Sequence, residues 1–135
     1  MTKIKNNYLG NLRTDSLHVP SGNKIITDAP IDNKGRGEAF SPTDLVCASL
    51  ASCMMTIMGI VAERDGIDIS GMTSDVEKFM TSNPRRISEI KIDIKLPAAH
   101  NLSDKHRDIL KRAAMTCPVT LSLHPEVKQT ISFNF

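Results

Sequence analysis

The segment SPTD at residues 41–44, followed by the uncharged stretch LVCASLASCMMTIMGIVA at residues 45–62, decides the fold that the sequence predicts. Ser41 is a favourable N-cap, the proline after it suits the first helical position, and Asp44 is placed to hydrogen-bond back to the cap. Beyond the stretch, Gly66 supplies a residue that can end a helix in the left-handed conformation. The sequence therefore predicts one long helix that begins after Ser41 and ends just before Gly66.

The eighteen uncharged residues 45–62 make this helix apolar on nearly every side. A stretch of this length meets the threshold for a membrane span, but serine, threonine and glycine dilute it and no aromatic belt flanks it. A helix that is apolar all round is otherwise buried all round. Because a chain of 135 residues can hardly surround such a helix alone, we expect a homodimer and no membrane partner.

Short strands are expected before the helix. Residues 6–18 and 24–27 have the composition of strands, and the Pro, Ser, Gly and Asn of residues 19–23 indicate a turn between them. Residues 32–38 are polar and rich in glycine, so they are expected to form a loop.

The segments after the helix alternate between strands and shorter helices. Residues 67–80 and 87–96 are predicted to form an antiparallel pair, and the second of these alternates isoleucine or leucine with charged residues. Ser103 is expected to cap a second helix, which Cys117-Pro118 interrupts before a further short helix. Residues 130–135 alternate as a closing strand.

Composition limits the classes of function. A hydrophobic fraction of 40% and a charged fraction of 24% are ordinary for one soluble globular domain, which we expect to cover residues 1–135. The net charge of +2 is spread along the chain without a basic run, so nucleic acid is not an expected partner. The N-terminus has no apolar signal segment, and three cysteines without a CxxC pair argue against a disulfide framework or a zinc site. We expect a cytoplasmic protein with reduced thiols and no metal.

The cysteines differ in what their positions favour. Cys117 precedes Pro118, and if it caps a short helix, the unpaired N–H groups and the helix dipole favour its thiolate. A buried, inert cysteine beside a proline is an equally ordinary interpretation. Cys53 lies in the middle of the long helix, where burial alone disfavours a thiolate unless the fold brings a cation to it. Cys47 is interpreted as core packing.

Three motifs resemble those of one family, the osmotically inducible protein C and organic hydroperoxide resistance (OsmC/Ohr) proteins. They are SPTDL at residues 41–45, ASLASC at residues 48–53 and CPV at residues 117–119. Residues 18–30, which include TDAP, resemble the OsmC-like branch in particular. The resemblance covers essentially the whole chain. It implies an α+β fold in which two subunits form an intertwined dimer, with antiparallel sheets around long central helices and active sites at the subunit interface.

The same resemblance implies a reaction. In this family a reactive cysteine reduces organic hydroperoxides, and here that role falls on Cys53. Its thiolate attacks the peroxide and becomes a sulfenic acid, Cys117 condenses with it to a disulfide, and an external dithiol reduces the disulfide. The resemblance implies no cofactor.

An arginine from the N-terminal strands holds the thiolate in this family, and Arg13 is the matching residue. In the best-studied branch a glutamate follows the proline that starts the long helix and positions that arginine. Here the residue after Pro42 is Thr43, and Asp44 already serves as a cap. Glu38, in the loop just upstream, is the carboxylate that we expect to reach the site instead.

A second interpretation keeps the fold without the chemistry. With Thr43 in place of the usual glutamate, the chain would be a non-catalytic OsmC-like dimer that binds a small apolar ligand. The two hypotheses differ in the reactivity of Cys53, because rapid alkylation near neutral pH favours the peroxidase and slow alkylation favours the binding protein.

Overall fold

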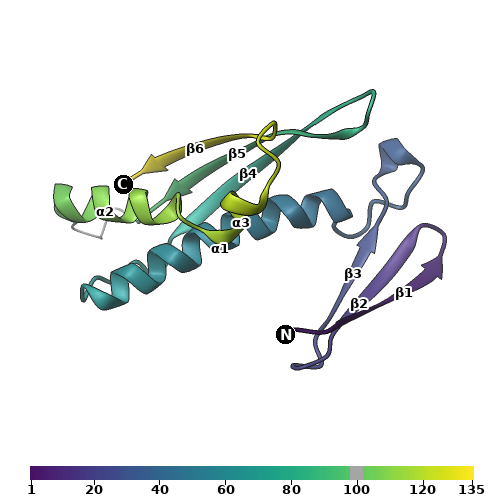
Figure 1. The fold of residues 1–135 in the computed structure, drawn as a ribbon, viewed down its shortest axis with the longest axis horizontal. Coiled ribbons are helices and arrows are strands. Elements are labelled where there is room, and N and C mark those ends of the chain that lie inside the picture. Colours follow the sequence, from purple (N-terminus) through teal and green to yellow (C-terminus); the bar gives the residue numbers. More distant parts are fainter. Residues whose placement is uncertain (98–101) are drawn as a thin grey trace. The chain divides into compact units, whose positions relative to one another are not determined.

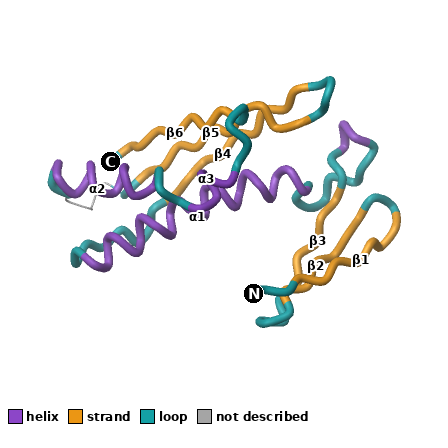
Figure 2. Tube along the Cα trace, viewed as in Figure 1, coloured by secondary structure: helices purple, strands orange, loops and turns teal. Residues whose placement is uncertain are grey.

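The structure is a computed structural model that describes residues 1–97 and 102–135. It is an α+β protein in which the described residues form two three-stranded sheets (Figures 1 and 2). The chain divides into two compact units, residues 1–46 and residues 47–135. The helix α1 (Pro42–Arg64) begins in the first unit and continues through the second. The single domain over residues 1–135 stays a prediction.

The first unit is an antiparallel sheet in the order β1-β2-β3. Its strands are β1 (Ile4–Gly10), β2 (Arg13–His18) and β3 (Lys24–Asp28). The expected strands and the turn between the second and third are confirmed. The expected loop after β3 contains one short 3₁₀ turn, η1 (Ile31–Asn33).

The turn between β1 and β2 consists of only two residues, since Gly10 pairs with Arg13. These residues, Asn11 and Leu12, have φ angles of 53° and 62°. Positive φ at both central positions is what a two-residue turn of type I′ requires. Leucine rarely adopts this conformation, and two hydrogen bonds hold it here. The Leu12 N–H donates to the Tyr8 hydroxyl oxygen at 3.2 Å, and the Leu12 carbonyl accepts from the Ala29 N–H at 3.0 Å.

The ends of α1 follow the sequence closely. The Ser41 N–H donates to Asp44 Oδ2 at 2.9 Å, and the Asp44 N–H donates to Ser41 Oγ at 3.0 Å. This reciprocal pair is the predicted capping box. At the other end, Gly66 has a φ angle of +68° and the Ile67 N–H reaches back to the Ala62 carbonyl at 2.8 Å. Helix termination at Gly66 is thus also confirmed.

One stripe of α1 is buried within the chain. Its members recur at helical spacing and are Cys47, Leu50, Ala51, Met54, Met58 and Ala62. By length and composition α1 is apolar enough to cross a membrane, but the core helix of a soluble protein meets the same criteria. The buried stripe packs into the hydrophobic core of the second unit.

The second unit contains the sheet β4-β5-β6. Its strands are β4 (Thr73–Thr81), β5 (Arg86–Lys95) and β6 (Lys128–Asn134). The antiparallel pairing of β4 with β5 is confirmed, but β6 runs parallel to β5, so this sheet is mixed rather than antiparallel. A parallel neighbour needs a long crossover connection, and α2 (Asp104–Ala114) and α3 (Pro118–Ser122) lie in that connection.

The start of β4 differs from the prediction. The sequence predicted a strand from residue 67, whereas β4 begins at Thr73. The Ser70 N–H donates to Asp68 Oδ1 at 2.9 Å, the Met72 N–H donates to the Ile69 carbonyl at 3.1 Å, and Gly71 has a φ angle of +86°. These turn contacts compete with extended pairing in this segment.

The core of the second unit lies between the sheet and the helices α1 and α2, which cover one face of the sheet (Figure 1). Ile90, Ile92 and Ile94 of β5 point into it and are at most 1% exposed. Leu110 of α2 is completely buried against the same cluster, and Ser103 caps α2 as predicted by accepting from the His106 N–H.

Candidate active site

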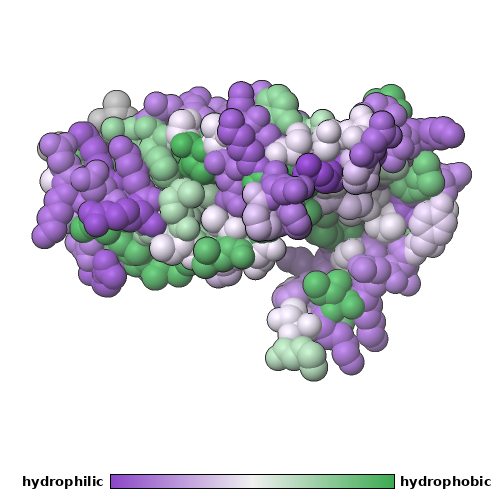
Figure 3. Space-filling model, turned by 45° about the horizontal axis from the view of Figure 1, so that its top comes forward, coloured by the Kyte–Doolittle hydropathy of each residue, from purple (hydrophilic) through white to green (hydrophobic). Residues whose placement is uncertain are grey.

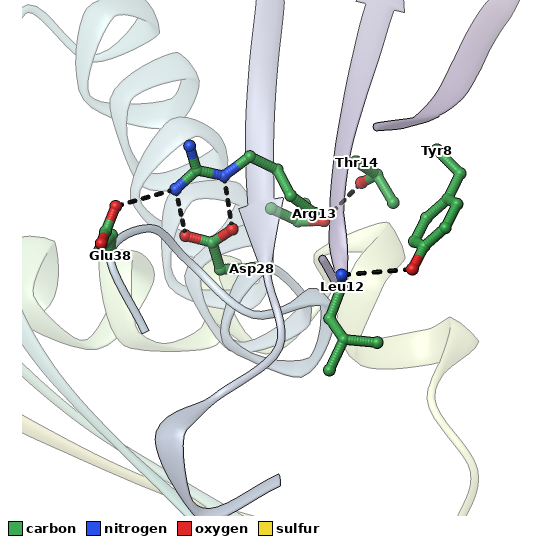
Figure 4. A network of polar contacts seen from close by, with 7 residues as sticks. Tyr8, Leu12, Arg13, Thr14, Asp28 and Glu38 are labelled. Carbon is green, nitrogen blue, oxygen red and sulfur yellow. Dashed lines mark hydrogen bonds and ion pairs between the residues drawn. The ribbon is translucent and has the colours of Figure 1, made fainter. Parts of the chain in front are cut away.

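The polar part of the candidate site begins with the pairing of β2 and β3. Arg13 and Asp28 lie directly opposite each other in this antiparallel pair, which places their side chains on one face. Arg13 Nε donates to Asp28 Oδ1 at 2.7 Å, and Nη2 donates to Oδ2 at 2.8 Å (Figure 4). This bidentate geometry is the strongest form of an arginine–carboxylate pair.

Glu38 is the second carboxylate at Arg13, as its place in the sequence suggested. Arg13 Nη2 donates to Glu38 Oε2 at 3.1 Å. The loop that carries Glu38 packs on Ala29: the Gly37 N–H donates to the Ala29 carbonyl at 3.2 Å, and a Cβ atom at Gly35 would lie 1.7 Å from the Ala29 carbonyl oxygen. The backbone of this loop therefore packs against Ala29, the residue that follows β3.

Electrostatic interactions in this network favour the charged forms of Arg13 and Asp28. The hydrogen bond to Asp28 raises the pKa of Arg13 above its ordinary value, and the hydrogen bond to Glu38 raises it further. Desolvation of the guanidinium opposes this shift. The hydrogen bond from Arg13 lowers the pKa of Asp28, against desolvation, and a backbone hydrogen bond from Glu38 and the charge of Arg36 lower it further. One guanidinium thus faces two carboxylates.

Arg13 nevertheless keeps donors for a ligand. A guanidinium has five N–H groups, and the contacts with Asp28 and Glu38 use those on Nε and Nη2. In the part of the chain that the structure describes, no acceptor contacts Nη1, which points away from both carboxylates in Figure 4. The Arg13 side chain as a whole is 22% exposed.

Asp28 is the residue that sequence reasoning missed, because we interpreted Asp28-Ala29-Pro30 only as the end of a strand. Its side chain is completely buried, and a buried carboxylate requires a partner. The register of the hairpin is the signal that could have identified Asp28. Leu17 pairs with Lys24 beside the turn, and the same register continued along the strands pairs Arg13 with Asp28.

Cys53 lies on α1, in the second unit. It is half-buried and packs against the apolar cluster that forms the core of that unit. Cys47, six residues earlier, is only 3% exposed and belongs to the cluster itself, which confirms the predicted core packing.

Cys117 is the N-cap of α3, as its place before Pro118 predicted. It is completely buried. Its Sγ atom accepts a hydrogen bond from the Thr120 N–H at 3.2 Å and lies 3.0 Å from the Thr120 hydroxyl oxygen. The sulfur of Cys117 therefore has two polar neighbours within an otherwise apolar core.

The structure brings two of the four predicted site residues together. Arg13 and Glu38 are in contact within the first unit, whereas Cys53 and Cys117 both border the core of the second unit. Among residues 1–97 and 102–135, no group of three or more histidine, cysteine, aspartate or glutamate side chains is arranged to hold a metal ion.

These features define an α+β protein with one cysteine on a long core helix and another at the N-cap of a short helix. The chain belongs to the OsmC-like protein family, whose model matches residues 35–132. The expected family is thus confirmed.

Solved structures agree with this assignment. A Psychrobacter arcticus protein named for an inferred role in osmotic stress and detoxification is 51% identical, with a TM-score of 0.94, and the match covers 99% of this chain and 96% of that one. Two others share the fold. The Legionella pneumophila organic hydroperoxide resistance protein OsmC is 20% identical with a TM-score of 0.75, and the match covers 100% of this chain and 97% of that one. The other is a Vibrio cholerae protein that is named as an organic hydroperoxide resistance protein and was solved with captopril in one active site. It is 16% identical with a TM-score of 0.73, and the match covers 99% of this chain and 91% of that one. No protein among the curated ones matches this chain.

Proposed function

We propose that this chain is a thiol-dependent peroxidase that reduces organic hydroperoxides to alcohols. The Cys53 thiolate attacks the terminal peroxide oxygen, the O–O bond breaks, and the alkoxide takes a proton to leave as an alcohol. Cys53 is then a sulfenic acid, which condenses with the Cys117 thiol to a disulfide and releases water. An external dithiol reduces this disulfide and becomes a disulfide itself.

The observation that carries the proposal is that the two cysteines border one apolar core. Cys53 packs against the buried cluster of which Cys117 is a member. The Thr120 N–H donates to Cys117 Sγ, and the Thr120 hydroxyl oxygen lies 3.0 Å from the same atom. An apolar environment at Cys53 favours the alkyl part of an organic peroxide over small, polar hydrogen peroxide. The name of the Legionella relative, an organic hydroperoxide resistance protein, points in the same direction.

Arg13 supplies the cation in this proposal. A guanidinium beside a sulfur favours the thiolate and donates to peroxide oxygens. Its Nη1 N–H groups are the donors that remain for this task after Asp28 and Glu38 have taken the others.

We also propose a homodimer. Although one stripe of α1 is buried, other apolar residues of the same helix are open to solvent in one chain, such as Ile60 at 59%. Hydrophobic side chains also lie at the surface beside hydrophilic ones in Figure 3. A second copy would cover the uncovered side of α1, and sedimentation equilibrium should give twice the mass of one chain. A dithiol-dependent cycle also requires a reducing compartment, so we assign the protein to the cytoplasm.

The test is consumption of an organic hydroperoxide by the purified protein with a dithiol. Cys53→Ser should reduce turnover to the uncatalysed background. Cys117→Ser should still release one equivalent of alcohol but then stop or cycle slowly. Cys47→Ala is the matched control and should keep turnover. A Cys53→Ser protein that turns over like the unmodified chain would refute the proposal.

One observation favours the alternative of a binding protein. A groove of about 430 Å³ runs between α1 and β4, lined by Ala48, Ala51, Ser52, Met55, Thr56, Ser74 and Val76. A groove of this size and composition suits a small apolar ligand. If Cys53 reacts with iodoacetamide no faster than an unperturbed thiol and the protein consumes no hydroperoxide, this function replaces the first.

A further inference from the structure

The charge balance at Arg13 raises a problem for any role in stabilising a thiolate. Among the groups in direct contact, one positive charge faces two negative charges, while Arg36, outside these contacts, also lowers the pKa of Asp28. A network with this balance repels an anion unless N–H groups point directly at it. The two carboxylates therefore need separate explanations.

The two carboxylates are held very differently. The Asp28 side chain is 0% exposed, receives two hydrogen bonds from Arg13 and has a backbone hydrogen bond from Glu38. The Glu38 side chain is 67% exposed and contacts Arg13 through one hydrogen bond at 3.1 Å. Solvent screens an exposed single contact, and its net contribution is small. A buried bidentate contact fixes the plane of the guanidinium.

We propose that Asp28 is the positioning residue of Arg13, and that Glu38 is a counter-charge that weakens the effect of Arg13 on an anion. Asp28 then performs the task for which the resemblance implies a carboxylate at position 43, where this chain has Thr43. The proposal rests on the proposed peroxidase function, since the anion in question is the Cys53 thiolate or the peroxide oxygen.

The geometry explains how Asp28 acts. Because Asp28 occupies Nε and one side of Nη2, the guanidinium cannot rotate without breaking two hydrogen bonds. With both hydrogen bonds formed, Nη1 is the end of the guanidinium that points away from the two carboxylates (Figure 4). Two features hold the pair itself: the direct opposition of Arg13 and Asp28 in the sheet, and the hydrogen bond from Ala29 to the Leu12 carbonyl.

The test compares three changes of carboxylate to amide. Asp28→Asn removes one acceptor oxygen and the charge, Glu38→Gln removes the second counter-charge, and Asp15→Asn is the matched control. Asp15 lies on the same strand as Arg13 but accepts a hydrogen bond from Asn7 at 2.9 Å. Three quantities are measured on the full chain: kcat and KM with an organic hydroperoxide, the rate at which iodoacetamide labels Cys53 by peptide mass spectrometry, and the NMR signal of the Arg13 Nε–H group.

The two carboxylates should give opposite results. Asp28→Asn should lower kcat by on the order of a hundredfold with little change in KM, because misplaced catalytic groups cost about that much, and should slow Cys53 labelling. The Arg13 Nε–H signal should exchange rapidly with water. Glu38→Gln should keep that signal and speed Cys53 labelling by about two- to fivefold. Asp15→Asn should match the unmodified protein.

Two results would overturn the proposal. If only the charge of Asp28 matters, Asp28→Asn will speed Cys53 labelling as Glu38→Gln does. If Glu38 is the anchor, Glu38→Gln will lose the protected Arg13 signal and Asp28→Asn will keep it. Should Asp28→Asn not fold, Arg13→Lys replaces it, because lysine keeps the charge but cannot form the bidentate pair. Full activity of that variant would equally refute positioning.

Failure of the peroxidase function gives a different pattern. In that case the unmodified protein consumes no hydroperoxide, while the Arg13 signal still reports whether Asp28 or Glu38 holds the guanidinium. A protected signal that depends on Glu38 and not on Asp28 refutes the positioning role whether or not the protein turns over.

Discussion

The two units of the chain bury opposite kinds of residue. In residues 1–46 the buried residues are Thr27, Asp28 and Ser41, all polar. In the described part of residues 47–135 every buried residue is apolar or a cysteine. The first unit is thus organised by hydrogen bonds and an ion pair, and the second by a hydrophobic core.

The proposed function assigns a different task to each unit. A fixed cation needs polar partners, and the first unit supplies them at Arg13. In the proposed function the cysteines meet an organic substrate and need apolar surroundings, and Cys53 packs against the apolar cluster of the second unit. The first unit leaves Ile4, Tyr8, Ile25 and Ile26 exposed, each at 47% or more. A sheet with such a surface lacks a core of its own.

The largest expected effect is the loss of folding when the first unit is separated from the hydrophobic core of the second. A peptide of residues 1–40 should have no stable fold, because three short strands without buried apolar side chains do not balance the entropy of ordering. Far-UV circular dichroism should show a disordered chain without a cooperative thermal transition. A peptide that melts cooperatively as a monomer would contradict the comparison.

The hydrophobic core of the second unit should respond strongly to a cavity. Leu110 is 0% exposed, so Leu110→Ala should lower the free energy of unfolding by about 2–5 kcal/mol. Leu121→Ala is the control, since Leu121 is 74% exposed and should change stability little. Urea unfolding measures both, and equal effects would show that Leu110 is not part of a close-packed core.

The polar organisation of the first unit should appear as sensitivity to acid. Because Arg13 lowers the pKa of Asp28 in the folded protein, the carboxylate stabilises the fold fully above its unfolded pKa of about 3.9. That contribution is lost as the pH falls through the lower folded value. Thermal melts between pH 2 and pH 7 should therefore show a steeper acid loss for the unmodified protein than for Asp28→Asn. Identical slopes would mean that the pair does not contribute to folding.

The smallest effect concerns the polar contacts of Cys117 inside the apolar core. Thr120→Val removes the hydroxyl 3.0 Å from Sγ but keeps the backbone N–H. Disulfide formation after a pulse of organic hydroperoxide should slow severalfold, as quenched-flow mass spectrometry would measure. Thr116→Val is the control, because the Thr116 hydroxyl donates to the Ala113 carbonyl instead. An unchanged rate for Thr120→Val would remove the hydroxyl from the mechanism.

Local signals in the sequence were sufficient for the helices. The capping box of Ser41 and Asp44, the end at Gly66 and the N-cap role of Cys117 all depend on neighbours within a few residues, and all three are confirmed. Non-local pairing was harder. The parallel direction of β6 depends on how a connection of more than thirty residues crosses the sheet, and alternation within residues 130–135 carries no information about direction.

The site divides in the same way. Arg13 was proposed from the family resemblance and Glu38 from its place just upstream of the long helix. Their contact depends on the backbone of the loop at residues 35–37, which the sequence predicted only as a loop. Asp28 was missed because its partner lies fifteen residues away across a hairpin, and a strand-ending aspartate is an ordinary turn residue. The pairing register of β2 and β3 brings Asp28 to Arg13, and the composition of the segment does not reveal that register.

The turn at Asn11 and Leu12 also affects which substitutions evolution can accept at this position. Leucine at a φ angle of 62° lowers folding stability relative to glycine, so selection for stability alone would favour Leu12→Gly. Glycine would also widen the range of backbone conformations just before Arg13. The hairpin therefore couples two properties under selection, the folding stability of the chain and the orientation of the Arg13 guanidinium. A variant that gains stability at Leu12 would hold that orientation less firmly.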